Sequence, residues 1–295
     1  MRIPLLCTMI FLTACQALPS LPEWKSTEGL DHPDVGHVVD LRTDQRISAR
    51  TLVGRLAAAD HVLVGERHDN PDHHALQLWL LRALAERRPP GSILMEMIEP
   101  HQQPRVTKVQ RLVLKGVQPD DLPAALGWQS GWPWAMYGPL VEYSLAQPAA
   151  LLHANLDRDE IRKIYQQPPR LNGPAADPLV QKALLEQIRV SHCNMLPEST
   201  LPAMLAVQQQ RDLRMARQLI AAPVPSVLFA GAFHVRRDLG VPQHHPELAR
   251  PYGTRVLMLA EVGEPVTSAQ ADYVWFTPGP RQQDHCASHG SAGGR

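Results

Sequence analysis

The chain has 295 residues, in which 29 basic residues balance 29 acidic ones and hydrophobic residues make up 44%. Balanced charge excludes the strongly basic surface on which nucleic-acid binding depends, so we expect no nucleic-acid partner. The hydrophobic content is that of an ordinary globular protein, and the length suffices for one large core or two small ones.

The first fourteen residues have the pattern of a lipoprotein signal peptide. Arg2 supplies a positive end, and the apolar run from Ile3 to Leu12 is too short to span a bilayer as a helix. The run ends in Leu12-Thr13-Ala14-Cys15, so we expect cleavage before Cys15 and lipidation of Cys15. An ordinary secretory signal with a chance cysteine is the alternative.

The lipid on Cys15 is expected to be the only membrane anchor, because no later apolar stretch reaches membrane-spanning length. Gln16, where an aspartate would favour the inner membrane, indicates the outer membrane, with the protein facing the periplasm or the surface. We expect residues 15–36 to form a tether and residues 37–278 to form a single domain. Residues 279–295 are rich in Gln, Ser and Gly and are expected to be mobile.

The domain sequence alternates between strand and helix patterns. Short apolar or alternating runs predict strands at 37–41, 61–65, 93–97, 150–155, 226–231, 255–262 and 272–276, with a hairpin over 40–47. Helical patterns cover 49–59, the stretch from 71 (capped by Asn70), 101–114, 138–147, 158–165, 177–190 and 200–222. This order predicts an α/β fold with a central, mostly parallel sheet, helices on both faces and a mainly helical insertion at about 177–222.

A Gly-x-x-His motif occurs twice, as Gly65 to His68 and as Gly231 to His234, each time directly after an apolar strand. In open α/β sheets, ligands bind beyond the carboxyl ends of the strands. Glu66, His68 and His234 should therefore meet Glu96, which ends another strand. Such a set predicts a divalent-metal site or an acid–base site, unless these residues are merely satisfied polar groups beneath loops.

A second group of candidates could ligate or hold haem. His192 and Cys193 stand beside Met195, and tyrosinate is a known ligand of ferric haem iron. Tyr137, in an irregular aromatic segment, and Tyr165, at a helix end, are the candidate tyrosines, although structural roles are commoner for both. Arg211 could receive an anionic group, or it could lie on an ordinary solvated helix face. Cys193 and Cys286 could pair in an oxidising compartment.

The motifs together resemble the ChaN-type haem-binding uptake lipoproteins, in particular those of pseudomonads. The resemblance spans about residues 35–278 and rests on three stretches: Gly65 to His74 with Glu96, His192-Cys193 with Gln209 to Ala216, and Gly231 to Pro242. It implies an erythromycin esterase/ChaN-like fold and an iron-regulated lipoprotein that binds b-type haem between two copies. It also implies that a tyrosine of one copy ligates iron while a histidine of the other contacts a propionate.

We therefore expect a haem-binding homodimer that is not an enzyme and that serves haem acquisition, with an outer-membrane haem receptor as a further partner. The alternative is a metal-dependent hydrolase, because in the wider superfamily the residues that resemble Glu66, His68 and His234 belong to a hydrolytic or metal site. A passive interaction lipoprotein, in which the strand-end histidines have no role, is the third reading.

Overall fold

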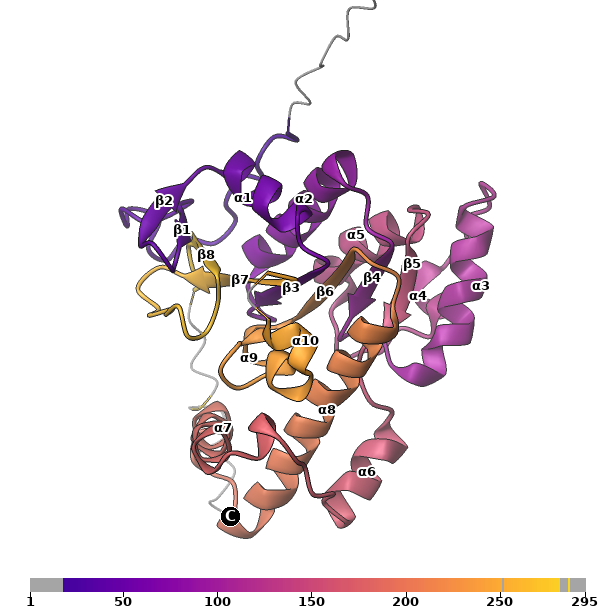
Figure 1. The fold of residues 1–295 in the computed structure, drawn as a ribbon. Helices are drawn as coiled ribbons and strands as arrows, with labels where there is room; N and C mark the ends of the chain where they lie inside the picture. The colour runs from indigo at the N-terminus through magenta and orange to yellow at the C-terminus, as the bar shows by residue number, and fades with distance from the viewer. Residues whose placement is uncertain (1–17, 251, 282–285, 287–295) are drawn as a thin grey trace, which may run out of the picture.

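The computed structural model describes residues 18–250, 252–281 and 286, which fold around one eight-stranded sheet (Figure 1). The strands are β1 (Val38–Asp40), β2 (Gln45–Ile47), β3 (His61–Glu66), β4 (Ser92–Met95), β5 (Ala150–His153), β6 (Ser226–Gly231), β7 (Thr254–Glu261) and β8 (Tyr273–Thr277). Their order across the sheet is β2-β1-β8-β7-β3-β6-β4-β5. The six strands from β8 to β5 are parallel to one another, whereas β1 pairs antiparallel with both β8 and β2.

The α-helices lie between the strands along the chain. They are α1 (Ala49–Ala57), α2 (Pro71–Arg87), α3 (Gln103–Val113), α4 (Leu122–Leu126), α5 (Trp134–Leu145), α6 (Arg158–Gln166), α7 (Pro178–Ser191), α8 (Leu201–Ala221), α9 (Ala232–Val235) and α10 (Pro246–Ala249). The predicted α/β class and the helical insertion between β5 and β6 are confirmed. Helix α5 begins at Trp134 rather than at 138, and the short helices α4, α9 and α10 were not predicted.

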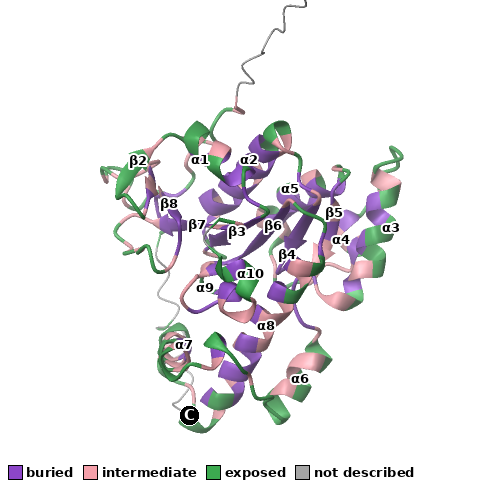
Figure 2. Ribbon diagram, in the orientation of Figure 1, coloured by how far each residue is buried: buried purple, intermediate pink, exposed green. Residues whose placement is uncertain are grey.

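Alternate side chains of the central strands enter two separate cores, one on each face of the sheet. The central strands are accordingly buried along their length (Figure 2). Val62 and Val64 of β3 pack among residues of α1, α2, α3 and α5, and Leu63 packs on the other face among residues of α8, α9 and α10. Burial on both faces explains why these strands are continuously apolar. A third, smaller core joins α7 to α8 through Leu184 and Leu205.

The segment expected to be a tether packs against the domain from residue 18 onward, so that prediction is wrong for residues 18–36. Leu18 and Trp24 contact the core, and the indole of Trp79 donates a hydrogen bond to the Pro19 carbonyl. The backbone amides of Lys25 and Ser26 donate to the carboxylate of Asp72, a residue in the first turn of α2. Composition did not reveal this packing, because the segment makes its hydrogen bonds to Asp72 and Trp79 through backbone groups, which are the same in every sequence.

Within the described residues, no helix is both long and apolar enough to cross a bilayer. The predicted signal peptide, the lipidation site Cys15 and most of the predicted tail lie outside the described residues.

Candidate functional site

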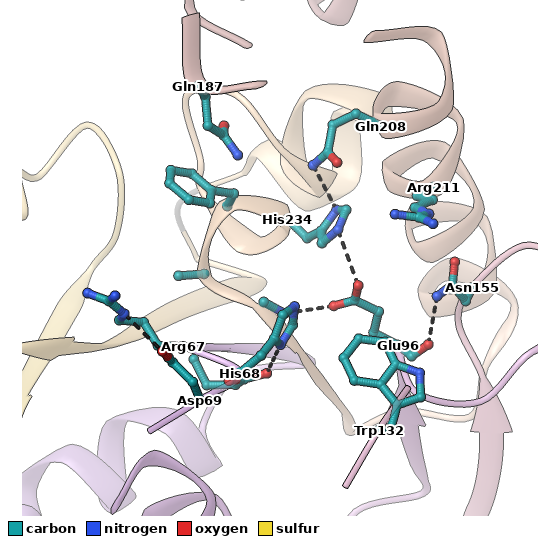
Figure 3. A pocket seen from close by; sticks show the side chains of 14 residues that line it. Arg67, His68, Asp69, Glu96, Trp132, Asn155, Gln187, Gln208, Arg211 and His234 are labelled. Atoms are coloured by element: carbon teal, nitrogen blue, oxygen red, sulfur yellow. Dashed lines mark hydrogen bonds and ion pairs between the residues drawn. The ribbon is translucent and has the colours of Figure 1, made fainter. Parts of the chain in front are cut away.

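A cavity of about 550 Å³ lies beyond the carboxyl ends of the parallel strands (Figure 3). The ends of β3, β4 and β6 supply Glu66, Glu96 and Gly231 to its wall, and helices α7 and α8 supply polar side chains from the opposite side. Both Gly-x-x-His motifs open onto this cavity, since His68 and His234 line it. The predicted convergence of Glu66, His68, Glu96 and His234 is therefore present.

Glu66 and His68 form a carboxylate–imidazole pair at the end of β3. The Glu66 side chain is fully buried, and its Oε1 lies 2.6 Å from His68 Nδ1. Burial lowers the pKa of His68, but the hydrogen bond and the charge of Glu66 outweigh burial and raise it above its usual value. Because Nδ1 is engaged, His68 has only Nε2 to offer to a ligand, and half of its side chain is exposed.

Glu96, His234 and Asp212 form a second, buried group. His234 Nδ1 lies 2.5 Å from Asp212 Oδ1, and Nε2 lies 3.4 Å from Glu96 Oε1. Burial opposes the charged imidazole, but the two carboxylates outweigh it and raise the pKa of His234 to about 10. Burial would likewise raise the pKa of Glu96, yet His234 and the Gly231 amide hold it well below its usual range. His234 is thus a buried cation at neutral pH.

In the part of the chain that the structure describes, three ligand atoms of His, Cys, Asp or Glu come within 4.8 Å of one another only at Glu99, His101 and Asp157. The four residues predicted as a metal or acid–base site therefore suit proton transfer better than they suit metal binding.

Tyr137 does not fit the predicted role of an exposed iron ligand. Its side chain is fully buried, and its hydroxyl lies 3.4 Å from Glu66 Oε1 and 3.3 Å from His68 Nδ1. Burial and the nearby Glu66 and Glu96 carboxylates raise the pKa of Tyr137 far above its usual value. The tyrosinate needed for iron binding is thus disfavoured here, and Tyr137 instead supports the Glu66–His68 pair.

The other three haem candidates lie at different places. Arg211 lines the cavity from α8, and its Nε is buried with no hydrogen-bond partner among the described residues. Tyr165 is exposed near the end of α6, and neither it nor His192 is among the residues that line the cavity. Of these three candidates, the structure brings only Arg211 together with the strand-end residues.

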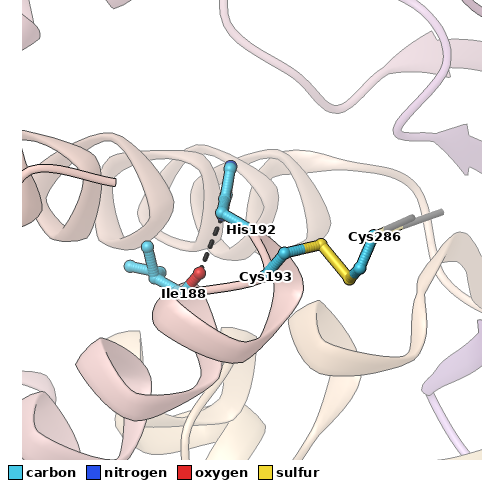
Figure 4. The surroundings of a disulfide bond; sticks show 4 residues. All are labelled: Ile188, His192, Cys193 and Cys286. Atoms are coloured by element: carbon cyan, nitrogen blue, oxygen red, sulfur yellow. Dashed lines mark hydrogen bonds between the residues drawn. A yellow bond between two sulfur atoms is a disulfide. The ribbon is translucent and has the colours of Figure 1, made fainter. Parts of the chain in front are cut away.

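His192 caps the end of α7 beside a disulfide that joins Cys193 to Cys286, so the open question of this pairing is answered (Figure 4). Its Nδ1 lies 2.8 Å from the Ile188 carbonyl, which can only accept, so Nδ1 donates this hydrogen bond and Nε2 takes no part in it. A histidine oriented in this way by a carbonyl is typical of metal and haem ligands.

Several site residues were not predicted from the sequence. Asp212 lies on α8 three residues after Gln209, and this spacing places both on one side of the helix. Trp132, with its ring centroid 5.0 Å from that of His68, and the exposed Phe233 supply the aromatic part of the cavity. Phe233 lies inside the second Gly-x-x-His motif, and its position there could have indicated that it lines the cavity.

The two histidines after the first motif, His73 and His74, are both buried. His73 accepts from the Arg67 amide and contacts the Thr277 hydroxyl, and His74 donates to the His68 carbonyl. They fix the loop that presents His68.

A family model described as haem-binding uptake, Tiki superfamily, ChaN matches residues 52–244. The chain belongs to this family. A solved structure described as cofacial haem binding to ChaN of Campylobacter jejuni is 28% identical, with a TM-score of 0.73, and the match covers 81% of this chain and 95% of that one. The fold of this ChaN-family chain is thus similar to that of a protein for which cofacial haem binding is described.

Two further solved structures are less similar. An erythromycin esterase mutant in its open conformation is 13% identical with a TM-score of 0.44, and the match covers 85% of this chain and 82% of that one. The type III effector HopBA1 is 13% identical with a TM-score of 0.41, covering 78% and 92%. At these values neither carries an argument about function. No curated protein sequence matches the chain.

Proposed function

We propose that this ChaN-family protein is a haem-binding lipoprotein of bacterial haem acquisition, of the kind found in pseudomonads, and that two copies hold haem between them. The observation that carries the proposal is the match to the Campylobacter jejuni ChaN structure, because it extends over 95% of that chain. Cofacial haem binding, as described for that protein, brings two haem groups together and so suits a pair of copies.

The residues of this chain fit a haem. Two imidazoles, His68 and His192, are held through Nδ1 and leave Nε2 to a ligand. Trp132 and Phe233 offer aromatic surface to a porphyrin, and the unpartnered Nε of Arg211 could receive a propionate. His192 and the exposed Tyr165 are the candidate iron ligands outside the cavity, and His68 is the candidate inside it.

Lipidation of Cys15 and an outer-membrane location remain part of the proposal. The Cys193–Cys286 disulfide supports export, because disulfides persist in oxidising compartments such as the periplasm. Regulation by iron and delivery from, or to, an outer-membrane haem receptor complete the proposed role.

Haemin titration of the chain from Gln16 to Arg295, which contains every described residue, tests the proposal. We expect a shifted Soret band and a change from monomer to dimer in analytical ultracentrifugation. A high-spin spectrum with a charge-transfer band would indicate tyrosinate, and a low-spin spectrum would indicate histidine. If haemin causes neither a spectral change nor association, the proposal is wrong.

Three variants identify the ligand. His192→Ala, Tyr165→Phe and His68→Ala each remove one accessible candidate, and the variant that removes the iron ligand should change the spectrum. Tyr137→Phe should leave the spectrum unchanged, because Tyr137 is fully buried. His32→Ala, which alters another partly exposed imidazole, serves as the matched control.

Hydrolysis is a second candidate, favoured by the paired acid–base groups in one cavity. His68, oriented by Glu66, has the geometry of a general base, and the charged His234 lies nearby as a potential acid or anion-stabilising group. A panel of ester and peptide substrates with and without Mn²⁺ tests this function, with His68→Asn as the inactive reference. Turnover that is unaffected by His68→Asn would argue against this site.

A further inference from the structure

Helix α3 carries a row of cations that the haem site does not use. Arg105, Lys108, Arg111 and Lys115 follow one another at intervals of three, three and four residues, which place them along one side of the helix and its last turn. All four are exposed, and none is paired with a carboxylate among the described residues. No acidic residue occurs from position 100 to position 119.

A groove of about 530 Å³ lies beside this row, between α3 and α4. Arg105 and Lys108 border it, and its floor is apolar, with Leu112, Val117 and Ala125 among the residues that line it. Val117 is 53% exposed and Leu114, in the same turn, is 50% exposed. We call the four cations with Leu114 and Val117 the basic groove. Large apolar side chains exposed among unpaired cations are typical of surfaces that contact membranes.

The basic groove ends on the side of the molecule where the described chain begins. Because α3 follows β4 and returns along the sheet, its last turn lies near the amino ends of the parallel strands (Figure 1). The chain enters from the same end at Leu18, three residues after Cys15 (Figure 1). The cavity with His68 and His234 lies at the opposite end, beyond the carboxyl ends of the strands.

We propose that the basic groove binds the headgroups of anionic phospholipids in the membrane that carries the lipid on Cys15, so that the haem site faces away from that membrane. The position of the basic groove points to the membrane only if Cys15 is lipidated, as proposed above. The charge and the exposed apolar surface of the groove do not depend on that lipid. A short path from Cys15 to the packed residue Leu18 keeps this end of the domain near the bilayer.

Neighbouring charges leave the groove positive. Asp120 and Asp121 follow it, but these two carboxylates face four cations, so the net charge of the region stays positive. Basic residues near an anionic bilayer each strengthen binding about fivefold, and the effect falls off within a Debye length. Four such residues predict a binding gain of roughly 100-fold or more that weakens with salt.

Vesicle co-sedimentation tests the inference with the chain from Gln16 to Arg295, which lacks the lipid but keeps all described residues. We expect binding to vesicles of phosphatidylcholine in which roughly one lipid in three is phosphatidylglycerol. We expect little binding to pure phosphatidylcholine. Replacing Arg105, Lys108, Arg111 and Lys115 with Gln should weaken binding roughly 100-fold.

The matched control replaces four exposed cations at the other end of the molecule, Arg162, Lys163, Arg170 and Lys182, with Gln. This control changes the net charge by the same amount as the first variant and should retain most of the vesicle binding. Equal loss in both variants, or equal binding to neutral vesicles, would overturn the inference. Full competition by soluble glycerophosphoglycerol would show a site for a free phosphate ester and would also overturn it.

Haemin titration of the Gln variant separates this inference from the proposed function. A variant that loses vesicle binding but keeps the haemin spectrum supports the basic groove as an independent surface. Failure of vesicle binding in a protein that still binds haemin rejects only the membrane contact.

Discussion

His234 is a buried imidazolium held between two carboxylates, Glu96 and Asp212. A buried charge is tolerated only where such partners replace its hydration, and removal of one partner leaves an uncompensated charge. The ion pairs of His234 with Glu96 and Asp212 thus link the stability of the domain to pH. Since the pKa of His234 is raised from 6.5 to about 10, its contribution is complete below pH 6.5 and is lost as the pH rises to 10. Glu96, whose pKa is lowered, contributes above pH 4.5 and loses its contribution as the pH falls.

We predict that Asp212→Asn lowers the free energy of unfolding by about 3 kcal/mol at pH 6, because His234 keeps only one carboxylate. The difference from wild type should shrink as the pH rises from 6.5 towards 10, where His234 loses its proton in both proteins. Urea denaturation across this pH range measures both effects. Asp31→Asn, a change at an exposed carboxylate, should have little effect, and a pH-independent loss in Asp212→Asn would contradict the assignment of charge.

The sequence could predict four members of the site because parallel strands end at one edge of the sheet, so residues after β3, β4 and β6 must meet there. Asp212 was beyond such reasoning, because its place depends on how α8 docks against the sheet. The burial of Tyr137, one of the candidate iron ligands, was beyond such reasoning for a similar reason: an aromatic-rich segment carries no signal of whether a given ring lies inside or outside.

At the scale of elements, the first turn of α2 joins three parts of the chain. The Asn70 side chain caps the helix by accepting from the Asp72 and His73 amides, and it donates to Glu261 and to the Pro278 carbonyl. Capping by Asn70 was predictable from its position before Pro71. The attachment of the N-terminal segment to Asp72 was not, since it depends on backbone amides far away in sequence.

We predict that Asp72→Asn releases the N-terminal segment and exposes the Lys25–Ser26 bond to trypsin. The reason is that an amide group supplies one acceptor where the carboxylate supplies two, so the Lys25 and Ser26 amides cannot both remain bound. Limited proteolysis followed by mass spectrometry should show cleavage after Lys25 at least tenfold faster than in wild type, an order-of-magnitude expectation from the loss of about 1.5 kcal/mol or more. Asp31→Asn is again the control, and equal cleavage rates in the two variants would mean that Asp72 does not hold the segment.

At the scale of the whole molecule, the disulfide between Cys193 and Cys286 connects the end of α7, in the helical insertion, to the chain beyond the last strand. The two cysteines are 93 residues apart, so the bond closes a long loop and restricts the unfolded chain. Loop closure of this size stabilises a fold by about 2–4 kcal/mol in most measured cases. It also fixes the turn that follows His192, one of the candidate iron ligands.

We therefore predict that a reductant lowers the free energy of unfolding of the chain from Gln16 to Arg295 by about 2–4 kcal/mol, as measured by urea denaturation. This chain contains no cysteine besides Cys193 and Cys286, so a thiol reagent should find none before reduction. The double variant Cys193→Ser, Cys286→Ser should have the stability of the reduced protein and should not respond to the reductant. An equal response in the double variant would mean that the reductant acts elsewhere. If His192 ligates the iron, the haemin spectrum of the double variant should also change, because the turn after His192 is then no longer fixed.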